Sequence, residues 1–310
     1  MLSNPTFKVF KNGNLPFKIC DLKRREEPLN LLMCSPEYFD ILDVKNIHMI
    51  GNESLLNKDL ALQQWQDLYN TYQNLLAEQV ITELNVIAGV QGCEDMVFCA
   101  NQTFPWVNSL KQKEVWMSKM RHPSRQKEVP YFESYFKTLG YLPKHFEITP
   151  LFEGMGDTIP HPGRNLLYGG YGHRSDVSAY TELAEKLQVP IIALELINQN
   201  FYHLDTCFVP LSDTQVMLCK EAFTDEGLAL LRLCFEEVFE IPVAEAIDTF
   251  CLNAHAIHNP YNGKKAAIIQ AGSLEAKRIL AHCNYQVIEV QTSEFMKSGG
   301  SVFCMKMMFY

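Results

Sequence analysis

The chain has 310 residues, of which 47% are hydrophobic, and carries 27 lysines and arginines against 36 aspartates and glutamates. This apolar fraction is typical of a folded globular protein and excludes wholesale disorder. A length near 300 residues allows one large α/β domain or two smaller ones. The formal net charge of −9 argues against nucleic acid or an anionic membrane as the main partner, and it suits a cationic small substrate.

The ten cysteines are scattered singly, without a Cys-x-x-Cys pair. This distribution favours free thiols in a reducing compartment over a disulfide framework. The N-terminal residues Met1–Pro5 carry no apolar core of a secretory signal. No uncharged apolar run approaches the roughly 18 residues of a membrane span. We therefore expect a cytoplasmic protein with no membrane partner.

A strand, an amphipathic helix and a second strand recur five times along the chain. In chain order, the segments of the units are 29–34, 58–76 and 84–87; 114–117, 128–139 and 145–148; 166–168, 179–187 and 191–194; 215–219, 225–235 and the segment after 239; and 266–270, 274–280 and 287–290. The helices begin near residues 58, 126, 178, 225 and 273, so the period is loose. Ser273 is the expected N-cap of the last helix. On pattern alone, internal repetition and a plain doubly wound sheet both remain open.

The domain boundaries follow from the same reading. Residues 1–28 precede the first unit and are expected to form an N-terminal extension. No linker rich in Pro, Gly or Ser divides the rest of the chain. Residues 29–310 are therefore expected to form a single domain.

Several short segments carry residues suited to chemistry. Gly299 and Gly300 precede Cys304, whose thiol at a loop-to-strand edge is a candidate nucleophile. The alternation of residues 201–208 predicts a strand with His203 and Asp205 on one face. Two further acidic segments lie at 94–95, just before an expected strand, and at 152–157, where glycines flank the acids. Each feature alone also fits an ordinary role, as a buried thiol or a solvated polar face.

Together, a thiol, an imidazole and several carboxylates fit nucleophilic attack on a cationic carbon. Carboxylates bind a guanidinium well because its planar fork of N–H donors matches their two oxygens. His255 and His258 lie three residues apart without a nearby carboxylate or cysteine, so no metal site is expected. Neither a phosphate-binding loop nor a dinucleotide fingerprint is present, so no organic cofactor is expected.

Six segments in order resemble the guanidine-modifying enzymes of the pentein fold. These include arginine deiminases, dimethylarginine dimethylaminohydrolases, arginine–glycine amidinotransferases and, with the greatest similarity, the catalytic domain of bacterial arginine dihydrolases. The matching segments are Leu31–Pro36, Asp95–Asn101, Phe152–Asp157, Gly170–Ser175, Phe201–Cys207 and Thr292–Cys304. The resemblance implies a five-bladed, pseudo-symmetric α/β propeller of ββαβ units around a central active site.

The resemblance also implies roles for individual residues. Cys304 is then the nucleophile, His203 the general acid/base and Glu153 the acid that supports the histidine. The residues matching substrate contacts are Asp95 and Asp205 at the guanidinium, Arg174 and Asn46 at the amino-acid end, and Asn101, which is typical of the dihydrolases. The thiolate would attack the guanidinium carbon to form a thiouronium, which water hydrolyses. Because neighbouring carboxylates raise the pKa of a thiol, we expect the bound cation to activate Cys304.

Some features depart from the family pattern. Asp205 stands where dimethylarginine hydrolases usually carry lysine, and Lys119 lies near a position where they carry arginine. Residues 102–106 differ from the Ala-Gly that follows the asparagine in dihydrolases, and the second domain of the long dihydrolases is missing. The substrate is therefore left open among arginine, methylarginines, agmatine and citrulline. An amidinotransferase, a non-catalytic pentein that only binds its ligand, and assembly into a homo-oligomer also remain open.

Overall fold

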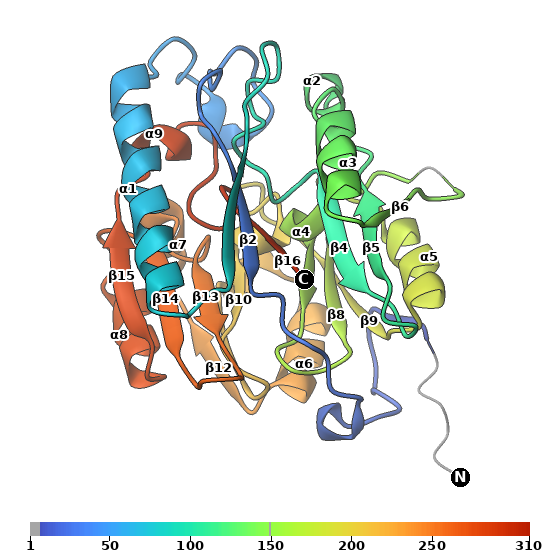
Figure 1. The fold of residues 1–310 in the computed structure, drawn as a ribbon. Coiled ribbons are helices and arrows are strands. Elements are labelled where there is room, and N and C mark those ends of the chain that lie inside the picture. The colour runs from blue at the N-terminus through green and yellow to red at the C-terminus, as the bar shows by residue number, and fades with distance from the viewer. Residues whose placement is uncertain (1–6, 149) are drawn as a thin grey trace.

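The computed structural model describes residues 7–148 and 150–310, so the N-terminal segment Met1–Pro5 lies outside the described residues. Within them, the strands form five separate sheets of one design (Figure 1). In each sheet a central strand pairs antiparallel with one neighbour and parallel with the other. The sheets are β16 (Met307–Phe309), β2 (Asn30–Cys34) and β3 (Glu83–Ile87); β4 (Thr103–Val107), β5 (Lys113–Met117) and β6 (Leu142–Lys144); β7 (Thr158–Pro160), β8 (Leu167–Tyr171) and β9 (Ile191–Glu195); β10 (Phe208–Pro210), β11 (Gln215–Leu218) and β12 (Glu237–Glu240); and β13 (His255–His258), β14 (Lys265–Gln270) and β15 (Gln286–Val290).

A helix follows each central strand and leads to its parallel neighbour, as a parallel pair requires. These helices are α1 (Lys58–Ala77), α3 (Val129–Thr138), α5 (Val177–Leu187), α6 (Asp225–Cys234) and α8 (Glu275–His282). In α1, the buried Trp65, Leu68, Tyr72 and Leu75 recur every three or four residues, which places them on one face of the helix. In Figure 1, α1 and α8 lie on one side of the molecule and α3 and α5 on the other, with β2 and β16 between them.

Shorter helices lie in the connections: α2 (Pro123–Gln126), α4 (Gly154–Asp157), α7 (Val243–Thr249) and α9 (Ser293–Met296). Side chains cap the starts of some of the helices. The Asn57 side chain accepts a hydrogen bond from the Leu60 amide at α1. The Ser273 hydroxyl accepts one from the Ala276 amide at 3.2 Å, so the cap expected at the last helix is confirmed.

The five strand–helix–strand units are confirmed, but the strand predicted at 145–148 was placed wrongly. It lies at β6, because the chain reverses directly after α3 through Gly140, whose φ is +79°. Pro143 sits within β6, where it is tolerated because the strand lies at the edge of its sheet. The strand expected after residue 239 likewise begins earlier, at Glu237.

The alternating strand predicted at 201–208 is also wrong. Leu204–Thr206 form a 3₁₀ turn instead. The Thr206 amide and hydroxyl both donate to the carbonyl oxygen of His203, at 3.2 and 2.6 Å, and close the chain into this turn. His203 and Asp205 therefore do not share the face of a strand, and their closeness comes from a tight turn.

Both ends of the described chain join the sheets. β1 (Val9–Phe10), from the predicted extension, adds a parallel strand to β9, and the C-terminal strand β16 pairs with β2. Arg25 also donates to the hydroxyl of Tyr310 at 2.9 Å. Among the described residues, no helix has the length and apolar character needed to cross a membrane.

Candidate active site

A small cavity of about 280 Å³ opens among the connections between the sheets. Its lining residues are Lys45, Asn46, Met49, Asp95, Phe98, Asn101, Arg125, Arg174, Tyr202, Ser298 and Cys304. None of them lies in a strand, so the sheets act as a scaffold for loops that carry the polar groups. Five of the eight residues predicted from the sequence line the cavity directly. The other three, Glu153, His203 and Asp205, lie in the wall and are at most 1% exposed.

Cys304 is held by two polar side chains. Its thiol lies 3.2 Å from Oδ2 of Asp205, to which it donates, and it accepts a hydrogen bond from Nδ2 of Asn253 at 3.1 Å. The Oδ1 atom of Asn253 accepts from the backbone amides of Cys304 and Ser301, which fixes the turn around the sulfur. Burial, followed by the Asp205 carboxylate, raises the pKa of Cys304 well above its usual value. The thiol is therefore protonated in the ligand-free protein.

The two glycines before Cys304 allow a close approach of the backbone. Gly299 has a φ of +84°, and a Cβ atom there would lie 2.7 Å from Oδ1 of Asn46. A Cβ atom on Gly300 would lie 2.4 Å from the ring of Phe98. Both residues must lack a side chain for the turn to place Cys304 against this wall.

His203, Glu153 and Arg174 form a buried chain of charged contacts. Nε2 of His203 lies 2.7 Å from Oε2 of Glu153, and Arg174 donates to the same oxygen at 3.1 Å. Burial raises the pKa of Glu153, but Arg174 and His203 together lower it below its usual value. Burial lowers the pKa of His203 to about 4, despite the neighbouring Glu153 carboxylate. The imidazole is therefore neutral at pH 7, while its carboxylate partner is charged.

Asp95 is paired with a lysine that the sequence did not single out. The Lys45 ammonium lies 2.9 Å from Oδ2 of Asp95 and 3.2 Å from Oε1 of Glu94, and it also contacts Asp43. The Lys45 side chain is 2% exposed. The hydroxyl of Ser298 donates to the other oxygen of Asp95 at 3.2 Å. The Lys45 ammonium is thus already paired with Asp95, the carboxylate predicted to bind the substrate guanidinium.

Arg174 and Asn46 form hydrogen bonds to backbone groups around the cavity. Arg174 donates to the backbone carbonyl of Lys45 at 2.9 Å and stacks over the ring of Tyr202. Asn46 caps a short 3₁₀ helix by accepting from the His48 amide at 3.0 Å, and it donates to the Ser298 carbonyl at 3.0 Å. Both residues predicted to contact the substrate thus tie the 45–49 loop to the rest of the site.

Asn101 has one paired and one unpaired end, and its buried amide nitrogen lies against Gly156. Its Oδ1 accepts from Arg125 at 3.0 Å, whereas its Nδ2 has no hydrogen-bond partner within residues 7–148 and 150–310. Arg125 is also paired with Glu128 at 3.1 Å, and burial raises the pKa of Glu128 to about 7. A Cβ atom on Gly156 would lie 2.1 Å from Nδ2 of Asn101, so only glycine fits there. The amide nitrogen is thus a buried donor without an acceptor among the described residues.

The sequence interpretation missed Lys45, Arg125, Asn253 and Ser298. Three of them gave no signal, because the predicted site residues that they contact lie far away along the chain, as with the 24 residues between Arg125 and Asn101 and the 51 between Asn253 and Cys304. Ser298 offered a weak signal, since it directly precedes the paired glycines. The predicted residues nevertheless come together: a protonated thiol, a neutral imidazole and buried carboxylates surround one small cavity. This set is suited to covalent attack on a cationic carbon followed by proton transfer.

Comparison with known proteins shows the family of the chain. The family model for eukaryotic N,N-dimethylarginine dimethylhydrolase matches residues 42–310, and the chain belongs to this family. It is 33% identical over 283 residues to the bifunctional arginine dihydrolase/ornithine cyclodeaminase AgrE of Nostoc sp., covering 89% of this chain and 37% of that protein. The chain thus spans little more than a third of this relative. It is also 28% identical over 248 residues to the N(G),N(G)-dimethylarginine dimethylaminohydrolase of Mycobacterium tuberculosis, covering 79% of this chain and 74% of that protein.

The fold is likewise similar to solved structures. The N-terminal domain of ArgZ, an arginine dihydrolase of the ornithine–ammonia cycle in Cyanobacteria, was solved as a mutant bound to substrate. It superposes with a TM-score of 0.81 at 28% identity, covering 90% of this chain and 97% of that chain. A second structure of the ArgZ domain is covalently bonded to a reaction intermediate, with the same TM-score, identity and coverage. The chain therefore has the α/β pentein fold of these enzymes.

Proposed function

We propose that the protein is a hydrolase that acts on the guanidino group of arginine or a close derivative through a covalent intermediate on Cys304. The observation that carries this proposal is the buried thiol that donates to the buried Asp205 carboxylate at the wall of the small cavity. The intermediate trapped on the ArgZ domain and the family match support the same chemistry. Asp95 and Asp205 hold the guanidinium, and Asn101, Arg174 and Asn46 contact the remainder of the substrate.

The proton balance follows from the three pKa shifts. At pH 7 the thiol is protonated, His203 is neutral, and burial raises the pKa of Asp205 to about 7. A bound guanidinium favours the thiolate, and the thiol proton passes to His203. As the sulfur bonds to the guanidinium carbon, His203 gives this proton to the departing nitrogen, and the carbon–nitrogen bond breaks. A cationic thiouronium on Cys304 remains.

Hydrolysis reverses the roles. A water molecule gives a proton to His203 and its oxygen attacks the thiouronium carbon. The carbon–sulfur bond then breaks, the thiolate takes the proton from His203, and the second proton of the water is released to solvent, which leaves a neutral ureido group. Starting from arginine, this releases ammonia and a ureido product. Glu153 keeps the imidazole oriented through the 2.7 Å contact and stabilises it while it carries the proton. A second round on the ureido product would yield ornithine.

The same proposal extends to the arrangement of the sheets. We place the five sheets around a central axis as a propeller, with residues 29–310 as the catalytic domain and residues 1–28 as an extension. Two observations support this arrangement. The last strand, β16, completes the sheet of the first unit. The antiparallel strands β7, β10, β13 and β16 of four different sheets all contribute residues to one hollow. Assembly into a homo-oligomer stays a prediction.

The decisive experiment is incubation of the protein with arginine, methylarginines, agmatine and citrulline, with the products identified by mass spectrometry. Cys304→Ala is the nucleophile control, and Cys283→Ala is the matched control because that thiol is also buried but lies outside the cavity. We expect ammonia or methylamine release that Cys304→Ala abolishes and Cys283→Ala preserves. Product formation by Cys304→Ala at the wild-type rate would disprove the nucleophile assignment. A dependence on an added amine acceptor would identify an amidinotransferase instead.

A further inference from the structure

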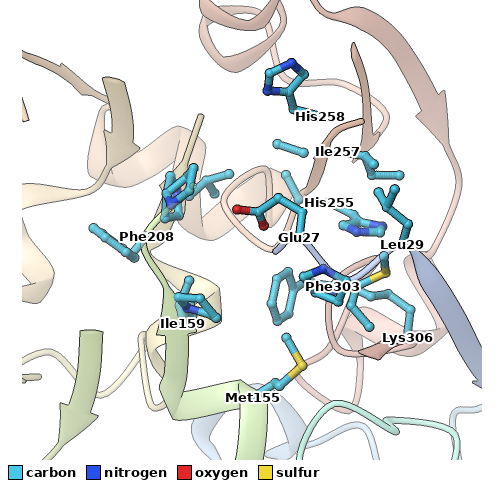
Figure 2. Close-up of a pocket in the computed structure, with 18 of the residues that line it drawn as sticks. Glu27, Leu29, Met155, Ile159, Phe208, His255, Ile257, His258, Phe303 and Lys306 are labelled. Carbon is cyan, nitrogen blue, oxygen red and sulfur yellow. The ribbon is translucent and has the colours of Figure 1, made fainter. Parts of the chain in front are cut away.

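A second, larger hollow of about 720 Å³ lies behind the nucleophile and shares no lining residue with the candidate active site. It is lined by the antiparallel strands of four sheets and by residues on either side of Cys304. Phe303 and Lys306 face this hollow, whereas Cys304 faces the small cavity. Figure 2 shows Lys306 and Phe303 on one wall, with Phe208 and Ile159 opposite them. The turn that carries the nucleophile thus forms a partition between two separate spaces.

Lys306 is a buried lysine in the wall of this hollow. It is 1% exposed, and its ammonium lies over the ring of Phe303, 3.1 Å from the ring centre. Within residues 7–148 and 150–310, it has no hydrogen bond to an acceptor and no ion pair with a carboxylate. Burial lowers the pKa of Lys306 to about 7, although the charge of Asp205 raises it. An ammonium that has lost its water shell without gaining an anion is costly, and a methionine would fill the same space without that cost.

The other polar groups of the hollow are already satisfied or uncharged. Glu27 is paired with Arg25 at 2.8 Å, and it also accepts from the Gly163 amide. His255 contacts the hydroxyl of Tyr72 at 3.0 Å, and burial lowers its pKa well below the usual value, so it is neutral. The pKa of His258, at the exposed rim, is lowered as well. Lys306 therefore supplies the single uncompensated positive charge of the hollow.

The remaining surface of the hollow is apolar. Met155, Ile159, Phe208 and Ile257 contribute side chains that are at most 6% exposed. A ligand that fits must present one negative charge to Lys306 and hydrocarbon to these side chains. A phosphate would bring more charge than one ammonium neutralises, and its desolvation among apolar groups would be more costly. A carboxylate on a short apolar body meets both requirements.

We propose that this hollow is a binding site for a small apolar monocarboxylate, whose carboxylate pairs with Lys306 while its hydrocarbon part contacts the apolar wall. The site is distinct from the candidate active site, and its occupancy does not depend on the proposed hydrolysis. Binding needs no rearrangement of Glu27, because Arg25 already neutralises that carboxylate. The ammonium then gains the anionic partner that the described residues do not provide.

The test uses hexanoate as the probe and hexanamide as its neutral counterpart, with binding measured by isothermal titration calorimetry on the intact chain. We expect hexanoate to bind with a dissociation constant on the order of 1 mM, as befits so small a ligand. Hexanamide should bind at least tenfold more weakly. Lys306→Met should weaken hexanoate binding at least tenfold, whereas Lys265→Met should leave it unchanged. Lys265 is the matched control because its ammonium also lies over an aromatic ring, that of Tyr285, but outside the hollow.

A measurement on the unmodified protein covers the case in which Lys306→Met does not fold. Acetylation by acetic anhydride, followed residue by residue by mass spectrometry, should be slowed by hexanoate at Lys306 and not at Lys265. Equal binding of hexanoate and hexanamide would overturn the proposal, as would hexanoate binding that survives Lys306→Met. Unprotected acetylation of Lys306 in saturating hexanoate would also overturn it, and would indicate that only water meets the ammonium.

Discussion

The pairing of Lys45 with Asp95 leads to a specific prediction about substrate affinity. If Asp95 holds the substrate guanidinium, the substrate must compete with an ammonium already lying 2.9 Å from that carboxylate. Replacing Lys45 by methionine keeps a side chain of similar length and removes the competing charge. We therefore expect Lys45→Met to lower the KM for a guanidinium substrate and to leave kcat nearly unchanged.

The size of the effect follows from the burial of the pair. Removing one partner of a buried ion pair leaves an uncompensated charge that costs about 3–5 kcal/mol. Lys45 shares its charge with Glu94 and Asp43, and Asp95 retains its hydrogen bond from Ser298, so only part of this cost falls on Asp95. If a guanidinium recovers about 1.4–2.8 kcal/mol, the KM falls roughly 10- to 100-fold. Without substrate, Lys45→Met should also have an unfolding free energy about 1–3 kcal/mol lower than wild type, and substrate binding should restore this loss.

The assay measures initial rates of ammonia release against substrate concentration, together with thermal unfolding with and without substrate. Lys58→Met is the matched control, because Lys58 pairs with Asp40 at 2.7 Å but is 64% exposed, and such surface pairs contribute little. Alkylation of Cys304 by chloroacetamidine, compared with neutral chloroacetamide, tests the same point without turnover. Lys45→Met should increase the preference for the amidinium reagent. An unchanged or higher KM, with an unchanged reagent preference, would refute competition and make Lys45 a substrate contact.

Three further predictions concern the buried wall of the site. The pKa of Asp205 is raised to about 7, so its contribution to stability is present below pH 4 and is lost as the pH rises through 7. The unfolding free energy of wild type relative to Asp205→Asn, from urea titrations, should therefore fall by up to about 4 kcal/mol over that interval, and a flat difference would contradict this. Gly156→Ala should lower the unfolding free energy by about 1–3 kcal/mol and remove most of the activity, because the added methyl group would overlap the Asn101 amide. Gly227→Ala is the control: its added methyl group would lie 3.5 Å from the nearest neighbour, so this variant should fold and turn over normally in the same assays. Glu153→Gln should lower kcat about 100-fold with little change in KM, and steady-state kinetics showing the reverse would assign Glu153 to substrate binding.

The sequence predicted those parts of the fold that depend on local patterns. The helices of all five units were located because apolar residues recur every three or four positions within one segment, as Leu68, Tyr72 and Leu75 do in α1. Two of the strand predictions that differ from the structure concern short segments in which a single interaction outweighs periodicity. At β6 the early reversal at Gly140 decides the position, and at 204–206 the hydrogen bonds from Thr206 do.

Most residues of the site were predictable, whereas most of their contacts were not. Motif order and resemblance selected Cys304, His203, Glu153 and Asp95, and the resemblance also implied the contact between Glu153 and His203. They did not indicate Asn253 and Lys45, which lie 51 and 50 residues away from their partners Cys304 and Asp95. Such pairs form only when connections from different sheets meet. No local sequence pattern distinguishes Lys45, which pairs with Asp95, from a lysine that remains exposed to solvent.

The protonation states of the site residues were even less predictable from the sequence than their contacts. The sequence predicted a raised pKa for Cys304 from neighbouring carboxylates, but burial is the larger cause, and Asp205 comes second. Burial likewise drives the pKa of Asp205 up and that of His203 down, so all three groups shift toward their neutral forms. The thiol, the imidazole and the Asp205 carboxyl therefore carry little charge, whereas Glu153, Arg174, Asp95 and Lys45 around them form ion pairs. His203 is therefore neutral at pH 7, and in the reaction that we propose the proton that reaches the leaving nitrogen comes from the thiol, after the cationic substrate has bound beside it.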